Sequence, residues 1–295
     1  MAEELRVGWI GTGVMGGPMA GHLLASGYPL TVFNRTKSKA QALLSKGARW
    51  AETPSALAEK SDIIFSIVGF PEDVRETYLG PNGVLQTAKS GQLIVDMTTS
   101  SPSLAREIAE EAAKKGVCAL DAPVSGGQSG AESGKLTIFV GGEKTGFERA
   151  LPLFQKLGKT VTWLGLAGSG QHCKMINQIL IAGNMLALAE AVTYASQCGL
   201  NAETAVEAVS QGAAGSWCLA NLGPRILRHD YAAGFYVDHF VKDLGIALAE
   251  AKKMKLSLPM LALAEQLYIA LQAQGHGRLG TQAIAKVYEA IRTTA

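Results

Sequence analysis

The chain is 295 residues long, with 47% hydrophobic and 18% charged residues. This balance is typical of a globular protein with a sizeable core, and it excludes a disordered chain or a fibrous repeat. The net charge of +2 comes from scattered basic and acidic residues, without the block of Lys and Arg that marks an arm for nucleic acid or an anionic membrane. We therefore expect no nucleic-acid partner and no membrane partner.

Short apolar runs alternate with helical segments along the first 170 residues. Bounded by Gly, Ser or Asp, these runs predict buried strands. The strands are expected at residues 6–10, 30–33, 63–68, 93–96 and 136–140. Helix starts are indicated by Pro, or by Ser or Thr before Pro, and the helices are expected at 55–60, 72–78 and 102–115. This alternation predicts the α/β class with a Rossmann-type, doubly wound parallel sheet.

The pattern changes after Gly170, where helical segments follow one another without a convincing strand. Residues 171–198 contain no proline and carry an apolar stripe, which predicts a helix of roughly 40 Å. Asn184 and Glu190 interrupt its apolar character, so we interpret it as a core helix rather than a membrane span. Further helices are expected at 202–211, 241–254 and 260–274. We predict two domains, 1–167 of Rossmann type and 168–295 all-helical, the second entered through the long helix.

The four cysteines show neither CxxC spacing nor the pairing of zinc ligands. This usage fits a reducing compartment, where structural disulfides are rare. The chain does not open with a basic segment followed by an apolar stretch, so we expect no signal peptide and a cytoplasmic protein. His172 and Cys173 form the only close pair of candidate zinc ligands, which argues against a zinc alcohol dehydrogenase, and we expect no metal site.

The segment 11–16 matches the pattern GxGxxG. It directly follows the first predicted strand and opens a helical segment, which is the context in which this pattern binds a dinucleotide. The first glycine makes a tight turn, the second lets the backbone approach the pyrophosphate, and the third lets the helix pack on the strand. The expected cofactor contacts are Gly11, Thr12, Gly13, Val14, Met15 and Gly16. The alternative is a structural strand–helix turn that binds nothing.

The second predicted strand ends in Asn34, Arg35 and Thr36. An NAD-preferring site usually carries Asp or Glu near this position, to accept a hydrogen bond from the ribose 2′-hydroxyl. Here a neutral amide is followed by an arginine, whose guanidinium can bind a 2′-phosphate by charge-assisted hydrogen bonds. The sequence therefore predicts NADP as the cofactor, with NADPH preferred over NADH. The alternative is that Arg35 is a solvated cap residue.

A group of polar side chains begins the long helix. Lys174, Asn177 and Gln178 share one helical face, which continues as the apolar stripe. Burial lowers the pKa of a lysine, which makes it a usable proton donor and acceptor near neutral pH, as carbonyl reduction requires. The spacing alone is equally compatible with a lysine that extends its amino group into solvent.

Three motifs, in this order and at these separations, carry a family resemblance: GWIGTGVMGGPMAGHL, DAPVSGG and GSGQHCKMINQ. They resemble the β-hydroxyacid dehydrogenase family, which includes 3-hydroxyisobutyrate dehydrogenase, tartronate semialdehyde reductase and glyoxylate/succinic semialdehyde reductase. The resemblance extends from Arg6 to about Ile291. It implies NADP(H)-dependent hydride transfer between a small hydroxy acid and its aldehyde or semialdehyde acid. It also implies a homodimer or homotetramer, in keeping with a largely apolar helical domain that would hardly cover itself alone.

The resemblance also implies roles for residues of this chain. Lys174 matches the catalytic lysine, and the Ser-Gly-Gly segment matches the loop that binds the substrate carboxylate. The residues implied for the substrate are Ser125, Gly126, Gly127, Asn177, Gln178 and Asp243. The family's substrate-contacting asparagine matches Asn177, although some members place this amide at the next position, Gln178.

The resemblance implies further contacts to the cofactor. Thr98 matches a residue near the nicotinamide, and Val68 and Pro71 match the loop along the adenosine side. Lys242 lies in a segment that resembles the one whose lysine reaches the cofactor. Without the family, Lys242 and Asp243 are better interpreted as an ordinary pair on a helix surface.

Two alternatives share the predicted fold. Imine reductases usually lack the lysine, and a non-catalytic NADP-binding protein could lose both the lysine and the Ser-Gly-Gly segment. This chain keeps both, which favours the dehydrogenase. No tyrosine has a lysine four positions later, which argues against a short-chain dehydrogenase.

Overall fold

The computed structural model describes residues 5–291 and divides the chain into two compact units, Met1–Lys174 and Met175–Ala295. Residues 1–4, on which part of the expectation about a signal peptide depends, lie outside the described range. The division falls within helix α8, Ser169–Gln197. The domain boundary that we propose from the sequence, between residues 167 and 168, lies just before this helix begins.

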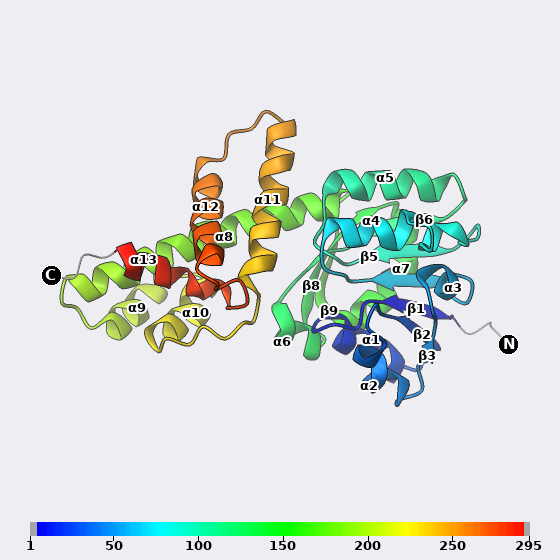
Figure 1. Cartoon of the computed structure of the whole chain (residues 1–295), viewed down its shortest axis with the longest axis horizontal. Helices are drawn as coiled ribbons and strands as arrows, with labels where there is room; N and C mark the ends of the chain where they lie inside the picture. The colour runs from blue at the N-terminus through cyan, green and yellow to red at the C-terminus, as the bar shows by residue number, and fades with distance from the viewer. Residues whose placement is uncertain (1–4, 292–295) are drawn as a thin grey trace. The chain divides into compact units, whose positions relative to one another are not determined.

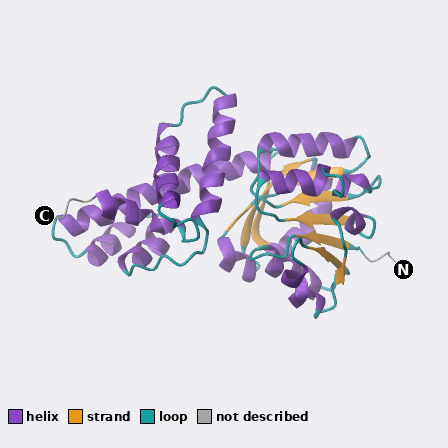
Figure 2. Cartoon of the chain, viewed as in Figure 1, coloured by secondary structure: helices purple, strands orange, loops and turns teal. Residues whose placement is uncertain are grey.

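The described part of the N-terminal unit contains a nine-stranded sheet of order β3-β2-β1-β4-β5-β6-β8-β7, with β9 beside β8 (Figure 2). The strands are β1 (Val7–Ile10), β2 (Leu30–Phe33), β3 (Arg49–Trp50), β4 (Ile63–Ser66), β5 (Leu93–Asp96), β6 (Cys118–Asp121), β7 (Val124–Ser125), β8 (Leu136–Gly142) and β9 (Gly158–Trp163). Pairing is parallel from β3 to β6, and β8 is antiparallel to both β6 and β7. The predicted fold class, a Rossmann-type sheet followed by an all-helical part, is confirmed.

Helices cover both faces of this sheet (Figure 1). They are α1 (Gly16–Ala25), α2 (Gln41–Leu44), α3 (Pro54–Ala58), α4 (Pro71–Leu79), α5 (Pro102–Ala113), α6 (Gly127–Glu132) and α7 (Lys144–Leu157). Side chains alternate along each strand, so Phe65 of β4 packs in the core shared with α1, α2 and α7, whereas Ile64 packs in the core shared with α3, α4 and α5. Since both faces are covered, the ends of the strands are where a ligand can approach.

In its described part, the C-terminal unit consists of helices and connecting loops, with one isolated bridge between Tyr236 and Gly280. Besides α8 it contains α9 (Ala202–Ser210), α10 (Trp217–Leu227), α11 (Val237–Lys253), α12 (Pro259–Ala273) and α13 (Ala285–Ile291). α11 and α12 form an antiparallel pair (Figure 1). Their core includes Phe240, Leu244 and Tyr268, each 0% exposed.

Among the described residues, α8 is the one helix that is long and apolar enough to cross a membrane, judged by length and composition. Its Ala182, Met185 and Ala189 are 0% exposed and belong to the core of the helical unit. The helix thus packs as a core helix, which is the interpretation that the sequence favours.

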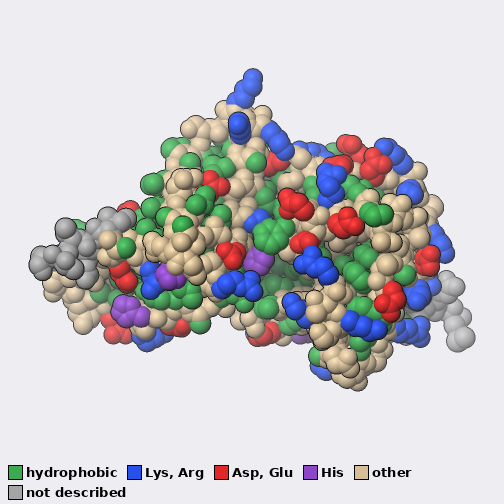
Figure 3. Space-filling model, viewed as in Figure 1, with side chains coloured by type: hydrophobic (Ala, Val, Ile, Leu, Met, Phe, Trp, Pro, Cys, Tyr) green, Lys and Arg blue, Asp and Glu red, His purple; other side chains and the backbone are tan. Residues whose placement is uncertain are grey.

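Charged side chains of both signs are interspersed over the face shown in Figure 3. Lys and Arg do not form a continuous basic surface on that face. The distribution agrees with the scattered charges of the sequence.

Candidate active site

The turn after β1 contains two glycines at which a side chain would clash with the backbone and one at which it would not. Gly11 has a φ of +92°, and a Cβ there would overlap the carbonyl oxygen of Ile67. A Cβ at Gly16 would overlap the carbonyl oxygen of Gly11. At Gly13, by contrast, a Cβ would meet no protein atom within 4 Å. The turn is therefore packed against the segment after β4 and open at Gly13.

The open side of this turn fits a dinucleotide. Thr12 is 5% exposed, and its buried Oγ1 has no hydrogen-bond partner within the described part of the chain. Its backbone N–H donates to Asn34 Oδ1 at 2.9 Å, and Asn34 Nδ2 donates to the carbonyl of Thr36 at 2.9 Å. Asn34 thus ties the turn to the end of β2. The exposed backbone at Gly13, the unpaired Thr12 hydroxyl and the start of α1 could together hold a pyrophosphate.

Arg35 presents a guanidinium at the end of β2. Its side chain is 86% exposed, and Nη1 donates to Asp73 Oδ1 at 3.1 Å. Asp73 Oδ2 accepts from the backbone N–H of Phe70, one residue before Pro71 opens α4. Among the described residues, Nε and Nη2 of Arg35 have no acceptor. This edge of a guanidinium carries two parallel donors and suits bidentate binding of a phosphate.

The segment after β5 is fixed by a buried carboxylate. Asp96 Oδ1 accepts from the backbone N–H of Thr98 at 3.1 Å and from Ser66 Oγ at 2.9 Å. Thr98 Oγ1 in turn accepts from the backbone N–H of Val68 at 2.9 Å. Burial raises the pKa of Asp96 to about 6, although the hydrogen bonds from Thr98 and Ser66 oppose this shift. Thr98 and Val68, both predicted cofactor residues, are thus brought together.

A second buried carboxylate fixes the start of α8. Asp121 is the register partner of Asp96 across β5 and β6, and it accepts from the backbone N–H groups of Gly168 at 2.7 Å and Gln171 at 2.8 Å. Burial raises the pKa of Asp121, and these hydrogen bonds oppose the shift. Lys174 lies three residues after Gln171 and is 6% exposed. This burial excludes the interpretation that its amino group extends into solvent.

The sequence interpretation assigned no role to three residues of this network, Asp96, Asp121 and Gln171. The available signals were the position of Asp96 at the end of the strand predicted at 93–96 and that of Asp121 as the first residue of the DAPVSGG motif. Gln171 stood within a motif but had no spacing that distinguished it from any other residue of a helix.

The Ser-Gly-Gly segment joins β7 to α6. Ser125 ends β7 and is half-buried, and its hydroxyl makes no hydrogen bond to the described residues. Gly126 and Gly127 have φ values of +129° and +61°, which side chains rarely adopt. The segment can therefore offer a hydroxyl and backbone N–H groups to a ligand.

The predicted residues of the C-terminal unit form a cluster of their own. Asn177 Nδ2 donates to Gln178 Oε1 at 2.7 Å, and Gln178 Nε2 donates to Asp243 Oδ2 at 2.6 Å. Lys242 Nζ lies 3.1 Å from Asp243 Oδ1. The side chains of Lys242 and Asp243 are 11% and 1% exposed. The interpretation of these two residues as an ordinary surface pair is therefore wrong.

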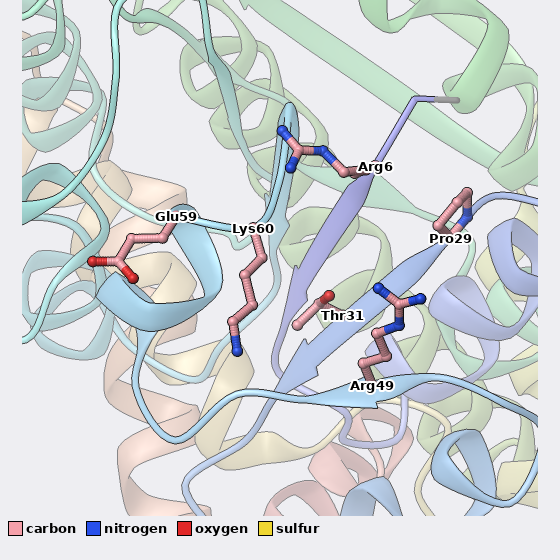
Figure 4. A pocket seen from close by; sticks show the side chains of 6 residues that line it. All are labelled: Arg6, Pro29, Thr31, Arg49, Glu59 and Lys60. Atoms are coloured by element: carbon pink, nitrogen blue, oxygen red, sulfur yellow. The ribbon is translucent and has the colours of Figure 1, made fainter. Parts of the chain in front are cut away.

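A separate pocket lies at the amino ends of β1, β2 and β3 (Figure 4). Its volume is about 180 Å³, and it is lined by Arg6, Pro29, Thr31, Arg49, Glu59 and Lys60. None of these is a predicted site residue. The glycine turn lies at the other, carboxyl end of the strands.

The fold and the site define the class of protein. A doubly wound sheet with a glycine turn at the end of its first strand is the arrangement of dinucleotide-dependent dehydrogenases. In residues 5–291, no three His, Cys, Asp or Glu side chains lie close enough to hold a metal ion.

Comparison with known proteins narrows this class. Residues 6–165 match the family model of the NAD-binding domain of 6-phosphogluconate dehydrogenase, and residues 168–288 match that of the NAD-binding domain of NADP-dependent 3-hydroxyisobutyrate dehydrogenase. A probable 3-hydroxyisobutyrate dehydrogenase-like protein of Arabidopsis thaliana is 53% identical over 97% of this chain and 86% of its own length. The 2-hydroxy-3-oxopropionate reductase of Escherichia coli is 39% identical over 97% of both chains.

A solved structure gives the same result. The 3-hydroxyisobutyrate dehydrogenase of Mycobacterium tuberculosis, determined with L-serine, has a TM-score of 0.89 and 28% identity, covering 98% of this chain and 99% of its own. This chain belongs to the β-hydroxyacid dehydrogenase family and is an oxidoreductase with NAD(P)-binding domains.

Proposed function

We propose that the protein interconverts a small hydroxy acid and its aldehyde or semialdehyde acid with NADP(H), and that Lys174 is the general acid and base. The observation that carries this proposal is the burial of Lys174 at the start of α8. The first turn of this helix is hydrogen-bonded to Asp121 at the carboxyl end of β6, the end of the sheet where doubly wound folds bind ligands. The names of the relatives support hydroxy-acid chemistry.

NADP is the proposed cofactor, with NADPH preferred over NADH. Residues 34–36 at the end of β2 include no carboxylate, and the nearby carboxylate of Asp73 is paired with Nη1 of Arg35, which leaves the Nε–Nη2 edge for a 2′-phosphate. Asn34 and Thr36 hold this end of β2 against the glycine turn. The remaining proposed contacts are Gly11, Thr12, Gly13, Val14, Met15, Gly16, Val68, Pro71, Thr98 and Lys242.

The proposed substrate carries a carboxylate. The Ser125 hydroxyl and the N–H groups of Gly126 and Gly127 would bind it, because a carboxylate accepts hydrogen bonds from several donors at once. The helical unit offers the cluster of Asn177, Gln178 and Asp243 for the polar end of the substrate. Gln178 is already bound to both of its neighbours, which favours Asn177 for direct contact.

The chemistry divides between cofactor and protein. NADPH, when bound, supplies the hydride for reduction, and NADP accepts it in the reverse direction. In reduction, the Lys174 ammonium donates a proton to the carbonyl oxygen as negative charge develops on it. In oxidation, the neutral amine removes the hydroxyl proton. The buried position of Lys174 limits competition from water.

The experiment is NADPH oxidation by the purified protein with glyoxylate, tartronate semialdehyde and succinic semialdehyde. We expect turnover with at least one of them and a higher kcat/KM with NADPH than with NADH. Arg35→Asp should lower kcat/KM for NADPH by roughly 10-fold or more, since it removes charge-assisted hydrogen bonds. Arg49→Asp, a charge change at the opposite end of the strands, is the control.

Two results would contradict these proposals separately. NADPH binding without turnover of any compound would favour a non-catalytic NADP-binding protein. Equal efficiencies with NADPH and NADH, unchanged by Arg35→Asp, would overturn the cofactor preference while leaving the dehydrogenase activity in place.

We also propose a cytoplasmic homodimer or homotetramer. One face of α8 exposes Ile176, Leu180 and Tyr194 at helical spacing, and these side chains are 59%, 63% and 73% exposed. The face continues onto α12, because Met260 lies against Gly183. A second copy of this chain would cover the apolar surface. Light scattering of Leu180→Glu should report a smaller particle than the wild type, and an unchanged mass would contradict this interface.

A further inference from the structure

Gln171 joins two segments that the proposed site needs to hold together. Its side-chain amide donates from Nε2 to the carbonyl of Thr98 at 2.7 Å and accepts at Oε1 from the backbone N–H of Ser100 at 2.9 Å. Gln171 is 0% exposed. One buried side chain of α8 therefore binds the backbone of the segment after β5 at two points.

The helix that carries Gln171 is itself immobilised. Asp121 accepts from the backbone N–H groups of Gly168 and Gln171. A Cβ at Gly170 would overlap the carbonyl oxygens of Phe139 and Asp121, so the first turn of α8 lies directly against β8 and β6. The first turn of α8 is thus held in place on the sheet, and through Gln171 it can hold the segment at Thr98.

Three hydrogen bonds hold Thr98 itself, and the one to Gln171 comes from α8. Asp96 binds its N–H, Val68 donates to its hydroxyl, and Gln171 donates to its carbonyl. The first two hydrogen bonds belong to the strands β4 and β5 and the segments after them. Without Gln171, the segment at Thr98 would keep its hydrogen bonds to the sheet and lose the two that Gln171 makes from α8.

Lys174 lies three residues after Gln171, so the two side chains lie on the same face of α8. We propose that Gln171 is a positioning residue, which sets the distance between the segment at Thr98 and Lys174. This inference rests on the proposed function, in which Thr98 lies beside the nicotinamide and Lys174 transfers the proton. Hydride and proton must reach the same carbonyl group, and a misplacement of about 1 Å can lower a rate by roughly 100-fold.

The test compares two buried glutamines of the same unit. Gln171→Met keeps the length of the side chain and removes both hydrogen bonds. Gln92→Met is the matched control, because Gln92 is 8% exposed and donates to the carbonyls of Ala58 and Ser61 at 2.7 and 2.5 Å, near the amino ends of the strands. Both variants lose buried hydrogen bonds, but only the first loses the connection to Thr98.

We expect Gln171→Met to lower kcat by roughly 10- to 100-fold. The Kd for NADPH should stay within about twofold, because the glycine turn and Arg35 are untouched. The primary deuterium isotope effect on kcat with NADPH deuterated at the transferred position should rise, since hydride transfer becomes more rate-limiting. Gln92→Met should leave kcat and the isotope effect at the wild-type values. If Gln171→Met does not fold, Gln171→Asn replaces it, since the shorter amide cannot reach both partners.

Lys174→Met, measured in parallel, separates the possible failures. If Lys174→Met is inactive and the Gln171 variant matches the Gln92 variant in kcat and isotope effect, the positioning role is overturned and the proposed function stands. If Lys174→Met keeps wild-type turnover, the proposed function fails, and the positioning role fails with it.

Discussion

The two units fix their predicted site residues in different ways. In the N-terminal unit the functional segments are turns at strand ends, and backbone groups fix them, as when Asp96 and Asp121 accept from N–H groups of Thr98, Gly168 and Gln171. In the helical unit the cluster consists of side chains from α8 and α11. Backbone turns can be recognised in the sequence, because only glycine fits some of their positions. A cluster of side chains on two helices has no comparable sequence motif.

The side-chain cluster should be the more fragile of the two. Asp243→Ala removes the carboxylate beside Lys242 and leaves a largely buried ammonium, which typically destabilises a protein by about 3–5 kcal/mol. Denaturant unfolding measures the loss, and hydrogen exchange should locate it in α11. Lys114→Ala on α5 is the control, because both side chains of its ion pair with Glu111 are exposed, at 67% and 44%, and such pairs contribute little to stability. Equal losses in the two variants would contradict the difference in burial.

The buried carboxylates of the N-terminal unit should make its stability depend on pH. The pKa of Asp96 is raised from 3.8 to about 6. Between these two pH values, the Asp96 carboxyl is protonated in the folded protein and ionised in the unfolded chain. The contribution of Asp96 to the free energy of unfolding is fully present below pH 4 and is lost as the pH rises to about 6. Relative to Asp96→Asn, the wild-type free energy of unfolding should fall by about 3 kcal/mol between pH 4 and pH 7.

Asp62 provides a control of opposite sign. Hydrogen bonding to Arg6 lowers the pKa of Asp62, so its contribution is present above pH 4 and is lost as the solution becomes more acidic. Unfolding of Asp62→Asn should therefore differ from the wild type in its pH dependence only at the acidic end. If the free energy of unfolding depends on pH in the same way for Asp96→Asn and the wild type, the raised pKa of Asp96 is ruled out.

The glycine turn separates cofactor binding from stability. Gly13→Ala places a methyl group in open space, so the melting temperature should stay constant or rise slightly. The same methyl group lies where the pyrophosphate must approach, and the Kd for NADPH should rise by roughly 100-fold. Gly16→Ala should instead destabilise the fold, because its Cβ overlaps the carbonyl oxygen of Gly11. An unchanged Kd in Gly13→Ala would contradict the proposed position of the cofactor.

Much of the fold could be predicted where local patterns were strong. The strands at 30–33 and 93–96 match β2 and β5, since their apolar runs are short and sharply bounded. Helix α7 was not predicted, because Gly146 and Pro152 both oppose a helix locally, and packing against the sheet overrides them. Helix α10 contains Pro224 and was missed for the same reason. Strand β9 lacks an apolar run, and only its pairing with β8 defines it.

In the candidate site, too, the features with a local sequence pattern could be predicted and those that depend on tertiary contacts could not. The glycine turn and Lys174 were identified from motifs and helical spacing. The contact between Gln171 and Thr98 joins residues 73 positions apart, and the contact between Gln178 and Asp243 joins residues 65 positions apart. Such hydrogen bonds depend on tertiary packing and cannot be predicted from composition or from the spacing of residues.

The most direct test of the central claim is the turnover of Lys174→Ala, measured at saturating NADPH with the best semialdehyde substrate. Tryptophan or cofactor fluorescence should first establish that the variant binds NADPH as the wild type does. Because positioned general acid–base catalysis contributes about 100- to 10,000-fold, we predict a loss of kcat in this range with the Kd for NADPH unchanged. Turnover above a tenth of the wild-type value, with cofactor binding intact, would contradict the assignment of Lys174 as the proton-transferring group.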